Sequence, residues 1–306
     1  MGNNRVLITG GCGFIGKHLC RRLVETGKDV TVLDIAAPQD GNINGCEVVR
    51  GDIGDRALVG KLMRSIDTVY HLAAVTTFHE CQEDPRATFR VNVRGTAILL
   101  RETLSHNVGN FVFFSSTSVY SGNSEPVKHE EMKLEPQSTY GLTKMQGEEL
   151  CSCAGKFGLP CASLRLFNVY GEGGRGVINK FVEAARGDRR IIIYGDGSQV
   201  RDYVYIDDVV RAAIAAGEGR LSGVYNVGTG KGSSVLQLKR MIERAEGITF
   251  EVEKRPRNEW DVQETLADIK KMARDLQVTP TTLEVGLAGL LHDTRRSSHQ
   301  VSCVRL

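Results

Sequence analysis

Two groups of residues in this sequence have side chains and spacing suited to chemistry. The first is a glycine-rich turn at residues 10–16, which follows the apolar run Val6 to Ile8 and opens a stretch with apolar residues at helical spacing. The second is Tyr140, which lies four residues before Lys144 and downstream of hydroxyl side chains at 115–118. The first group suits a phosphate-bearing ligand, and the second places a phenol and an ammonium on one helix face.

The glycine-rich turn is typical of a dinucleotide-binding site. Side chains there would hold the backbone away from a pyrophosphate, and free N–H groups at a helix start attract an anion. A glycine triplet also fits an ordinary turn, but here a second apolar strand, Val30 to Asp34, ends in an acid about 20 residues on. A carboxylate at Asp34 accepts from ribose hydroxyls and repels a 2′-phosphate, so we expect NAD rather than NADP. The expected cofactor contacts of the turn are Gly10, Gly13, Phe14, Ile15 and Gly16.

Two more predicted strands end beside this turn. The third strand, Glu47 to Ile53, carries Asp52, which either caps the helix that begins near Asp55 or contacts an adenine amino group. The fourth strand, Asp67 to Ala74, ends in small residues that would let a cofactor backbone lie close. The cofactor contacts expected from these strands are Asp52, Ile53, Leu72, Ala73 and Ala74.

A fifth strand, Asn110 to Phe114, delivers the hydroxyl cluster Ser115 to Ser118 to its carboxyl end, and a sixth runs from Cys161 to Leu166. In an open parallel sheet, ligands bind at that end of the strands. The helix that follows Pro136 carries Tyr140 and Lys144, whose Cβ atoms lie about 6 Å apart at this spacing.

Strands that alternate with helices predict an α/β fold with a doubly wound parallel sheet, a Rossmann domain. We expect this NAD-binding domain over residues 1–166, with part of 204–226 added to it. Residues 167–306 change to short helices, glycine turns and short strands, and predict a smaller, mostly α-helical substrate domain. Residues 290–306 lack clear periodicity and predict a frayed tail.

Composition limits the class of partner. The chain has 306 residues with 39 Lys and Arg against 37 Asp and Glu, a net charge of +2 that is too balanced for binding nucleic acid or a membrane surface. The sequence has no apolar run long enough for a membrane span and no signal peptide, so we expect a cytoplasmic protein. Its 8 cysteines and 7 histidines show no ligand spacing, which predicts reduced thiols and no metal.

Six motifs together resemble the extended short-chain dehydrogenase/reductase family, in particular nucleotide-sugar 4-epimerases of the UDP-glucose 4-epimerase kind. The resemblance runs from about Val6 to Asp275. It departs from the family pattern at Ser121, where glycine is usual, and at the end of the chain, which lacks the common final aromatic helix. The motifs are TGGCGFIG at 9–16, HLAA at 71–74, SSTSVY at 115–120, YGLTK at 140–144, RLFNVYG at 165–171 and YGDGSQVRDY at 194–203.

The resemblance implies an activity and a role for each matching position. It implies NAD-dependent 4-epimerisation of a UDP-sugar or another nucleotide sugar through a 4-keto intermediate, by a homodimer. Tyr140 matches the catalytic base, Lys144 binds the nicotinamide ribose and lowers the tyrosine pKa, and Ser116 bridges base and sugar, with Thr117 as the neighbour able to replace it. The substrate contacts implied, besides Ser116 and Tyr140, are Asn168, Arg201, Arg257 and Thr265.

Physical chemistry supports these roles. A phenol has a pKa of about 10, and a cation about 4 Å away contributes roughly 4 kcal/mol at an effective dielectric of about 20. Lys144 and a positive nicotinamide ring together are therefore expected to bring the pKa of Tyr140 near 7, where a general base works. Arginines suit phosphate, although Arg201 and Arg257 equally fit surface ion pairs. Thr265 is small enough to leave room for an N-acetyl group, or simply ends a strand, and Trp260 is the expected insertion in the spacing that places it.

Two other classes of function remain open. A dehydratase or decarboxylase of the same fold needs an extra acid beside the hydroxyl cluster, where this chain has Thr117 and Ser118. A non-catalytic NAD-sensing protein has no need of Tyr140 and Lys144 at helical spacing. The residues therefore favour the epimerase over both.

Overall fold

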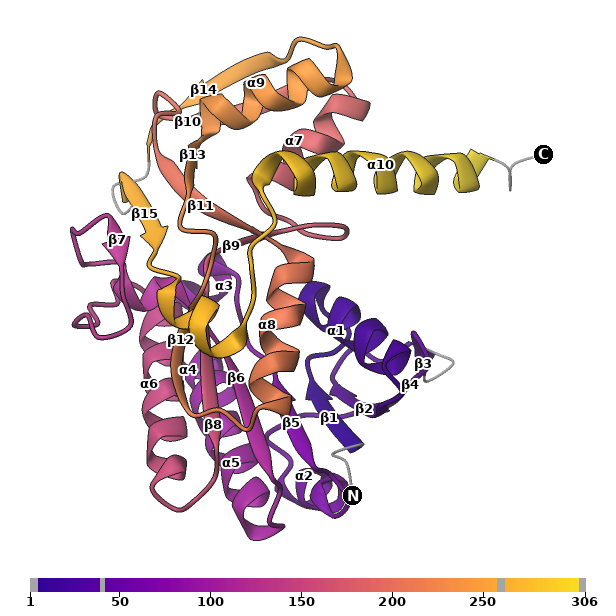
Figure 1. Cartoon of the computed structure of the whole chain (residues 1–306), viewed down its shortest axis with the longest axis vertical. Coiled ribbons are helices and arrows are strands. Elements are labelled where there is room, and N and C mark those ends of the chain that lie inside the picture. The colour runs from indigo at the N-terminus through magenta and orange to yellow at the C-terminus, as the bar shows by residue number, and fades with distance from the viewer. Residues whose placement is uncertain (1–4, 39–41, 258–261, 303–306) are drawn as a thin grey trace.

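The chain is organised around one large and mostly parallel sheet (Figure 1). The computed structural model describes residues 5–38, 42–257 and 262–302, so Trp260 lies outside the described residues. The sheet has eight strands in the order β12-β8-β6-β5-β1-β2-β4-β3, and of these pairs only β3–β4 is antiparallel. Its strands are β1 (Arg5–Thr9), β2 (Asp29–Asp34), β3 (Asn42–Ile43), β4 (Cys46–Arg50), β5 (Thr68–His71), β6 (Asn110–Ser116), β8 (Cys161–Leu166) and β12 (Gly223–Val227).

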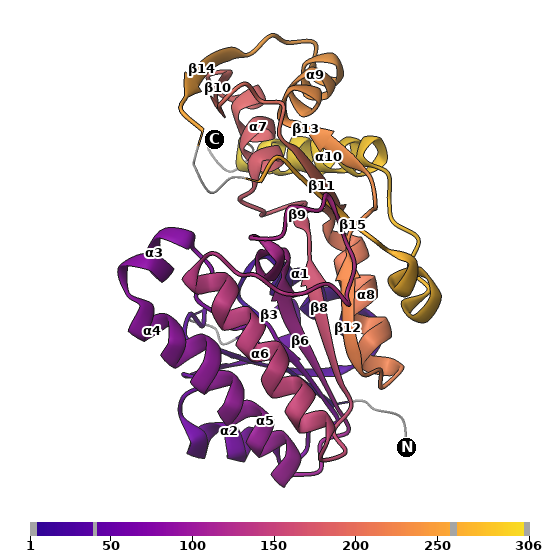
Figure 2. The same cartoon turned by 90° about the vertical axis from the view of Figure 1, so that its left-hand side faces the viewer.

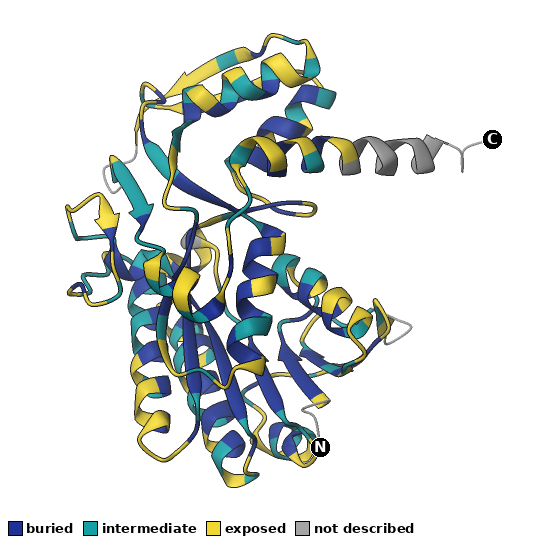
Figure 3. Cartoon of the chain, in the orientation of Figure 1, coloured by how far each residue is buried: buried dark blue, intermediate teal, exposed yellow. Residues whose placement is uncertain are grey.

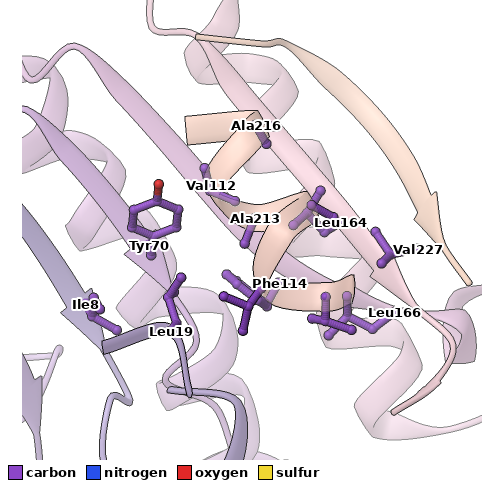
Figure 4. Packing of buried hydrophobic residues seen from close by; sticks show 14 of the residues in the cluster. Ile8, Leu19, Tyr70, Val112, Phe114, Leu164, Leu166, Ala213, Ala216 and Val227 are labelled. Carbon is purple, nitrogen blue, oxygen red and sulfur yellow. The ribbon is translucent and has the colours of Figure 1, made fainter. Parts of the chain in front are cut away.

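Helices cover both faces of this sheet (Figures 1 and 2). Successive residues of a strand point to opposite faces, and both faces of β1 are apolar. Ile8 packs with Leu19 of α1 and Ala213 of α8 on one face (Figure 4), whereas Leu7 packs with Val59 of α2 on the other. The helices are α1 (Phe14–Glu25), α2 (Arg56–Met63), α3 (Phe78–Glu83), α4 (Pro85–Phe89), η1 (Arg90–Gly95), α5 (Thr96–Ser105), η2 (Thr117–Tyr120), α6 (Thr139–Gly155) and α8 (Ile206–Glu218). The predicted doubly wound fold is therefore confirmed.

All six predicted strands are present, with shorter ends in two cases. β4 stops at Arg50, and β5 stops at His71, earlier than expected. Leu72 still donates its N–H to the Thr9 carbonyl at 3.0 Å, and Ala73 then passes against Gly10. The small residues Ala73 and Ala74 thus lie beyond the end of β5, where the glycine-rich turn comes close to the chain.

A smaller part lies beyond the carboxyl edge of the large sheet (Figures 1 and 2). It mixes helices with short strands around its own cluster of buried residues, which includes Phe181, Ile191 and Leu238. β10 pairs with β14, while β11 joins β13, β15, β9 and, through β15, β7. Its elements are β7 (Val127–Lys128), β9 (Asn168–Tyr170), α7 (Val177–Arg186), β10 (Arg190–Tyr194), β11 (Val200–Tyr205), β13 (Gly232–Ser234), α9 (Val235–Glu246), β14 (Glu251–Arg255), β15 (Glu264–Ala267), η3 (Met272–Leu276) and α10 (Leu283–Ser302).

Two late segments return to the large sheet. β12 extends it by pairing with β8, with Gly223 opposite Ala162 and Val227 opposite Leu166. α8 packs on the face that α1 also covers. Residues 206–227 therefore lie with the first part of the chain, although they follow the first elements of the second.

The prediction of a frayed tail over residues 290–306 is wrong for residues 290–302. α10 runs Leu283–Ser302, and Leu287, Leu290 and Leu291 are buried in the cluster of the smaller part. The spacing of these leucines by three and four residues gives α10 an apolar stripe, which is why the helix persists. Residues 303–306 lie outside the described chain.

Burial follows the layers: buried residues concentrate in the large sheet and on the inner faces of its helices (Figure 3). Among the described residues, no helix has both the length and the apolar character needed to cross a membrane. The seven cysteines in the described part of the chain are free thiols, as expected, and Cys303 lies outside it.

Candidate active site

The glycine-rich turn between β1 and α1 is packed too closely for side chains at two of its glycines. Gly10 has a φ of +75°, and a Cβ there would lie 2.6 Å from the Ala73 nitrogen; a Cβ at Gly16 would lie 2.6 Å from the Gly10 carbonyl oxygen. Gly13 is the N-cap of α1 and provides no side-chain cap, and the first turn, with Phe14 and Ile15, holds no acid. The backbone N–H groups at this helix end are therefore left without a side-chain acceptor, which fits a bound pyrophosphate.

Asp34 is fixed beside this turn. One carboxylate oxygen accepts from the Cys12 N–H at 2.9 Å, and the other accepts from the Ala36 N–H at 3.0 Å. The carboxylate therefore stands at the end of β2 next to the glycines, as a ribose-binding acid requires. Together with the glycines and the small residues Ala73 and Ala74 after β5, it forms a cradle that fits an adenine dinucleotide without a 2′-phosphate.

Asp52 does not cap the helix that follows it. Asp55 is the N-cap of α2 and accepts from the N–H groups of Ala57 and Leu58, while Asp52 accepts from the Gly54 N–H at 2.7 Å and stays exposed. Asp55 is one residue from the first helical turn, so its geometry as a cap is better. Contact of Asp52 with an adenine stays a prediction, as does that of its buried neighbour Ile53.

His71 is a buried residue of the HLAA motif to which sequence analysis gave no role. Thr96 donates to the Asn92 carbonyl at 2.6 Å and therefore accepts from His71 Nε2–H at 2.8 Å. His71 Nδ1 then accepts from Thr9 Oγ1 at 2.7 Å. Burial, with the positive charge of Lys144 as a second cause, lowers the pKa of His71 to about 3. A neutral histidine thus ties β5 to β1 beneath the cradle.

Tyr140 and Lys144 meet the hydroxyl cluster, as the sequence predicted. They lie in the first turns of α6, whose N-cap Ser138 accepts from the Gly141 N–H. Lys144 Nζ donates to the Phe114 carbonyl at 2.7 Å and lies 5.7 Å from the centre of the Tyr140 ring. The Ser116 hydroxyl donates to Ser118 Oγ at 3.1 Å and lies near Tyr140, where it acts to lower the pKa of the phenol. The phenol, the ammonium and the hydroxyl therefore converge at the carboxyl end of β6.

The protein alone does not bring the Tyr140 pKa to neutrality. Burial raises the pKa of Tyr140 to about 12, and the nearby Ser116 hydroxyl opposes this only in part. Burial also lowers the pKa of Lys144 to about 8, with the Glu148 carboxylate acting in the opposite direction. The lysine therefore holds its charge at neutral pH but loses it in mildly alkaline solution.

Three of the predicted substrate residues, Asn168, Arg201 and Thr265, line one small pocket beside this group, whereas Ser116, Tyr140 and Arg257 do not line it. The pocket has a volume of about 170 Å³. Its lining brings together Thr117 of η2, Asn168 of β9, Arg201 of β11 and Thr265 of β15. Thr265 lies inside its strand, opposite Arg201, so the alternative in which it ends a strand is wrong.

Arg257 does not line this pocket but lies near it. It donates to the Gln263 side-chain carbonyl at 2.7 Å, while Arg201 donates to the backbone carbonyls of Val200 and, at 3.4 Å, Gln263. Gln263 therefore places both guanidinium groups at one rim. Guanidinium groups make charge-assisted hydrogen bonds to anions, so both side chains suit an anionic ligand at this rim.

Sequence analysis missed part of the pocket wall. Tyr120, Ser121 and Val262 also line it, together with Ser118 and the buried residue Lys128. Lys128 donates from Nζ to the Asn123 carbonyl at 2.8 Å and lies in β7, which pairs with β15. Nothing in the local sequence signals this, because β7 is two residues long and its partner lies far along the chain.

Metal chemistry has no evident site in this part of the molecule. Among the described residues, no group of three or more His, Cys, Asp or Glu side chains is arranged to hold a metal ion. The polar groups that converge here are hydroxyls, a phenol and cations, which suit proton transfer and anion binding.

Comparison with known proteins agrees with this geometry. Residues 6–228 match the model of the NAD dependent epimerase/dehydratase family. The chain is 34% identical over 296 residues to the UDP-glucose 4-epimerase of Lactobacillus helveticus, covering 87% of this chain and 89% of that one. It is 30% identical over 259 residues to the UDP-N-acetyl-alpha-D-glucosaminuronate decarboxylase of Bacillus cytotoxicus, covering 78% of this chain and 79% of that one.

A solved structure is similar over nearly the whole length. MoeE5 in complex with UDP-glucose and NAD superposes with a TM-score of 0.89 at 33% identity, covering 96% of this chain and 99% of that chain. The match of the family model spans the cradle, the hydroxyl cluster and the Tyr140–Lys144 pair. The chain therefore belongs to the NAD-dependent epimerase/dehydratase family.

Proposed function

We propose that this enzyme is an NAD-dependent nucleotide-sugar 4-epimerase of the UDP-glucose/UDP-galactose type, with room for an N-acetylated sugar. The observation that carries the proposal is the convergence of Tyr140, Ser116 and Lys144 beside a pocket with an arginine at its rim. That arrangement offers a proton acceptor at one end and a site for a diphosphate at the other. Epimerisation through a ketone needs both.

The cofactor would be held by the cradle. The glycine-rich turn and the start of α1 would bind its pyrophosphate, Asp34 the adenosine ribose, and Lys144 the nicotinamide ribose. The chemistry that bound NAD would supply is reversible hydride transfer at carbon 4 of the sugar. The further contacts proposed are Asp52, Ile53, Leu72, Ala73 and Ala74.

The side chains of this site would move the proton. Tyr140 takes the proton of the 4-hydroxyl, directly or through Ser116, and gives it back after the ketone has turned over. Thr117 offers a second hydroxyl next to Ser116. Because burial raises the pKa of Tyr140 to about 12, the cationic Lys144 and the positive charge brought by the oxidised cofactor must both favour the phenolate.

The pocket rim would hold the substrate while its sugar turns. Arg201 and Arg257 are placed to make charge-assisted hydrogen bonds to the two phosphates, and Asn168 offers a neutral amide beside them. The sugar ring is thereby free to rotate around a fixed diphosphate. Thr265 faces the pocket as a small side chain and leaves space for a 2-substituent.

A dehydratase or a decarboxylase is the second candidate. The decarboxylase of Bacillus cytotoxicus is a relative over most of the chain, so the family permits this chemistry. The described residues that line the pocket include hydroxyls, amides and cations but no Asp or Glu. Proton transfer at carbon 5 lacks an acid in that lining, which favours the epimerase.

Product analysis distinguishes the candidates. Purified enzyme is incubated with UDP-glucose, UDP-galactose and their N-acetylated and uronic counterparts, and the products are separated and weighed by mass spectrometry. Interconversion of 4-epimers without a mass change or net NADH supports the proposal. Loss of water or of carbon dioxide supports the second candidate, and binding of NAD without turnover indicates a sensor.

Tyr140→Phe tests the proposed base. The variant should lose roughly 10²–10⁴-fold in kcat, since it lacks only the proton acceptor, and should still bind NAD and UDP-sugar. More than about a hundredth of the wild-type rate would count against Tyr140 as the base. Because Lys144 and Ser116 are unchanged in this variant, retained binding of NAD and UDP-sugar shows that the site is still folded.

The remaining expectations are kept as proposals. We propose two domains, 1–166 with part of 204–226 and 167–306, and a homodimer that works in the cytoplasm. Light scattering of the purified protein tests the dimer, and cell fractionation tests the location. The further inference below depends on neither.

A further inference from the structure

Three consecutive residues of β6 contact three residues on one face of α6. Phe114 accepts from Lys144 through its carbonyl, Ser115 donates to the Glu148 carboxylate, and Ser116 lies near Tyr140 and acts to lower its pKa. Tyr140, Lys144 and Glu148 are spaced by four residues, so they share this face. The third member, Glu148, has no place in the proton transfer described above.

Glu148 is buried together with Arg165 of β8. Their side chains are only 6% and 4% exposed, and Arg165 Nη2 lies 2.6 Å from one carboxylate oxygen while Nε lies 2.9 Å from the other. Arg165 Nη1 also donates to the Tyr120 hydroxyl at 2.6 Å. Such a fork-to-fork pair compensates two buried charges, and neither would be tolerated alone.

Among the described residues, no carboxylate lies within hydrogen-bond distance of Lys144. Its ammonium is buried, and its described hydrogen bond goes to a neutral carbonyl. Burial disfavours the charged form of a lysine, so an opposite charge is needed to keep it protonated. The titratable and charged groups that face Lys144 are Tyr140, Glu148 and Cys151 on α6, Cys81 on α3 and His71 on β5, with Arg165 on β8 beyond Glu148.

Most of these groups are uncharged at neutral pH. Burial raises the pKa of Tyr140 to about 12 and raises the pKa of both Cys81 and Cys151, so their protonated forms dominate. His71 is neutral because its pKa is lowered to about 3. Among the described groups that face Lys144, Glu148 therefore supplies the negative charge.

We propose that Glu148, paired with Arg165, is a positioning residue that keeps the Lys144 ammonium charged beside Tyr140. The dependence runs in one direction: Arg165 compensates Glu148, Glu148 favours the charged form of Lys144, and Lys144 favours the phenolate of Tyr140. The first two steps concern the protein alone, whereas the last rests on the proposed function.

The test replaces Glu148 with Gln, which keeps the shape of the side chain and removes its charge. Glu149→Gln is the matched control, because Glu149 is the next residue of α6 and is exposed. In ¹³C NMR of enzyme labelled at lysine Cε, the Lys144 signal is assigned by its loss in Lys144→Met. We expect its titration midpoint to fall by about one pH unit in Glu148→Gln and to stay unchanged in Glu149→Gln.

The pH profile of kcat gives a second readout. If the proposed function holds, the alkaline limb of the profile moves to lower pH by about the same amount, and kcat at pH 8 falls about fivefold. A purely structural role for Glu148 would lower the rate at all pH values without moving the limb. Glu148→Asp, which keeps the charge, should restore most of the wild-type profile.

The outcomes separate the two proposals. An unchanged Lys144 midpoint in Glu148→Gln overturns this inference, whatever the enzyme catalyses. A lowered midpoint in an enzyme that does not epimerise any sugar supports the inference and overturns the proposed function. If Glu148→Gln does not fold, Glu148→Asp provides the test. Its side chain is one methylene shorter, so the titration midpoint of Lys144 should fall by less than the one pH unit expected for Glu148→Gln.

Discussion

The cofactor cradle and the sugar pocket are built in different ways. The cradle consists of backbone: a glycine-rich turn, a helix start, and small residues after β5, fixed by the adjacent strands β1, β2 and β5. The pocket consists of side chains from η2, β7, β9, β11 and β15, which lie far apart in the sequence. The cradle should therefore fail when almost any side chain is added, whereas the pocket should change its preference when one side chain changes.

Gly10→Ala should cause the largest effect, because it breaks the backbone contact at the centre of the cradle. Gly27→Ala is its matched control: both glycines have positive φ, at +75° and +79°, but a Cβ at Gly27 meets nothing within 4 Å. The positive φ should lower the free energy of unfolding of each variant by about 1–2 kcal/mol. The free energy of unfolding of Gly10→Ala, measured with urea, should be roughly 2–3 kcal/mol lower than that of Gly27→Ala. Calorimetry should show that Gly10→Ala has also lost NAD binding. Equal losses in the two variants would show that the contact with Ala73 is unimportant.

His71 makes the cradle sensitive to acid. Its pKa is lowered to about 3 in the folded protein, below the ordinary value of 6.5, so the unfolded chain binds a proton that the folded one excludes between these values. The free energy of unfolding should therefore fall as pH falls through this window, by about 3 kcal/mol between pH 7 and pH 4.

The measurement is urea unfolding at both pH values for wild type and His71→Gln. Carboxylates contribute to acid unfolding in both proteins. The difference between the two slopes of unfolding free energy against pH therefore gives the contribution of His71. The variant should be less stable at pH 7 but lose about 3 kcal/mol less on acidification. Parallel slopes would mean that the pKa of His71 is the same in the folded and the unfolded protein.

The cradle could be predicted from the sequence because its parts depend on local signals. A glycine spacing, a strand that ends in Asp34 and small residues after the fourth strand each lie within one strand–turn–helix unit. Parallel strands then bring the ends of those units together without further information. The alternative left open at Asp52 was also local, since two acids three residues apart both fit the same cap, and the structure gives that cap to Asp55.

The pocket wall could not be predicted, because it depends on pairing at long range. Lys128 reaches the pocket through the pairing of β7 with β15, with Lys128 opposite Ala267. Glu148 and Arg165 lie on α6 and β8, and only the packing of that helix on the sheet makes them partners. Tail residues Leu287 to Leu291 became helical because a cluster from α7, β10 and α9 covers their apolar stripe.

Asp34 tests whether the cradle also contains a side-chain determinant. Its carboxylate is held by the N–H groups of Cys12 and Ala36, so it cannot turn away from a 2′-phosphate without losing them. Asp34→Asn should therefore bind NADP about thirtyfold more tightly than wild type does, which corresponds to about 2 kcal/mol of relieved repulsion.

Calorimetry with NAD and NADP provides the measurement. Wild type should bind NAD and show no comparable affinity for NADP. Asp29→Asn, at the exposed start of the same strand, is the control and should change neither affinity. Equal binding of both cofactors by wild type would exclude Asp34 as the determinant.

Thr265→Tyr should produce the smallest effect and the most selective one. Thr265 lies in β15 opposite Arg201 and shares the pocket of about 170 Å³ with Thr117 and Ser118. A phenol ring at this position would occupy much of that space, and the bulky N-acetyl group at carbon 2 would meet it before a hydroxyl would. Activity on N-acetylated UDP-sugars should fall about tenfold in kcat/KM, in the range that a few pocket contacts provide.

The neutral sugars supply the contrast that decides the role of Thr265. UDP-glucose and UDP-galactose should retain their kcat/KM, because Arg201, the proposed diphosphate contact, and Tyr140, the proposed proton acceptor, are unchanged. Thr249→Tyr places the same ring on an exposed position of the smaller part and should affect neither substrate class. Because the pocket is made of side chains, a single substitution can change its substrate preference in this way. An equal loss of kcat/KM on both substrate classes would instead show that Thr265 supports the strand and does not select the sugar.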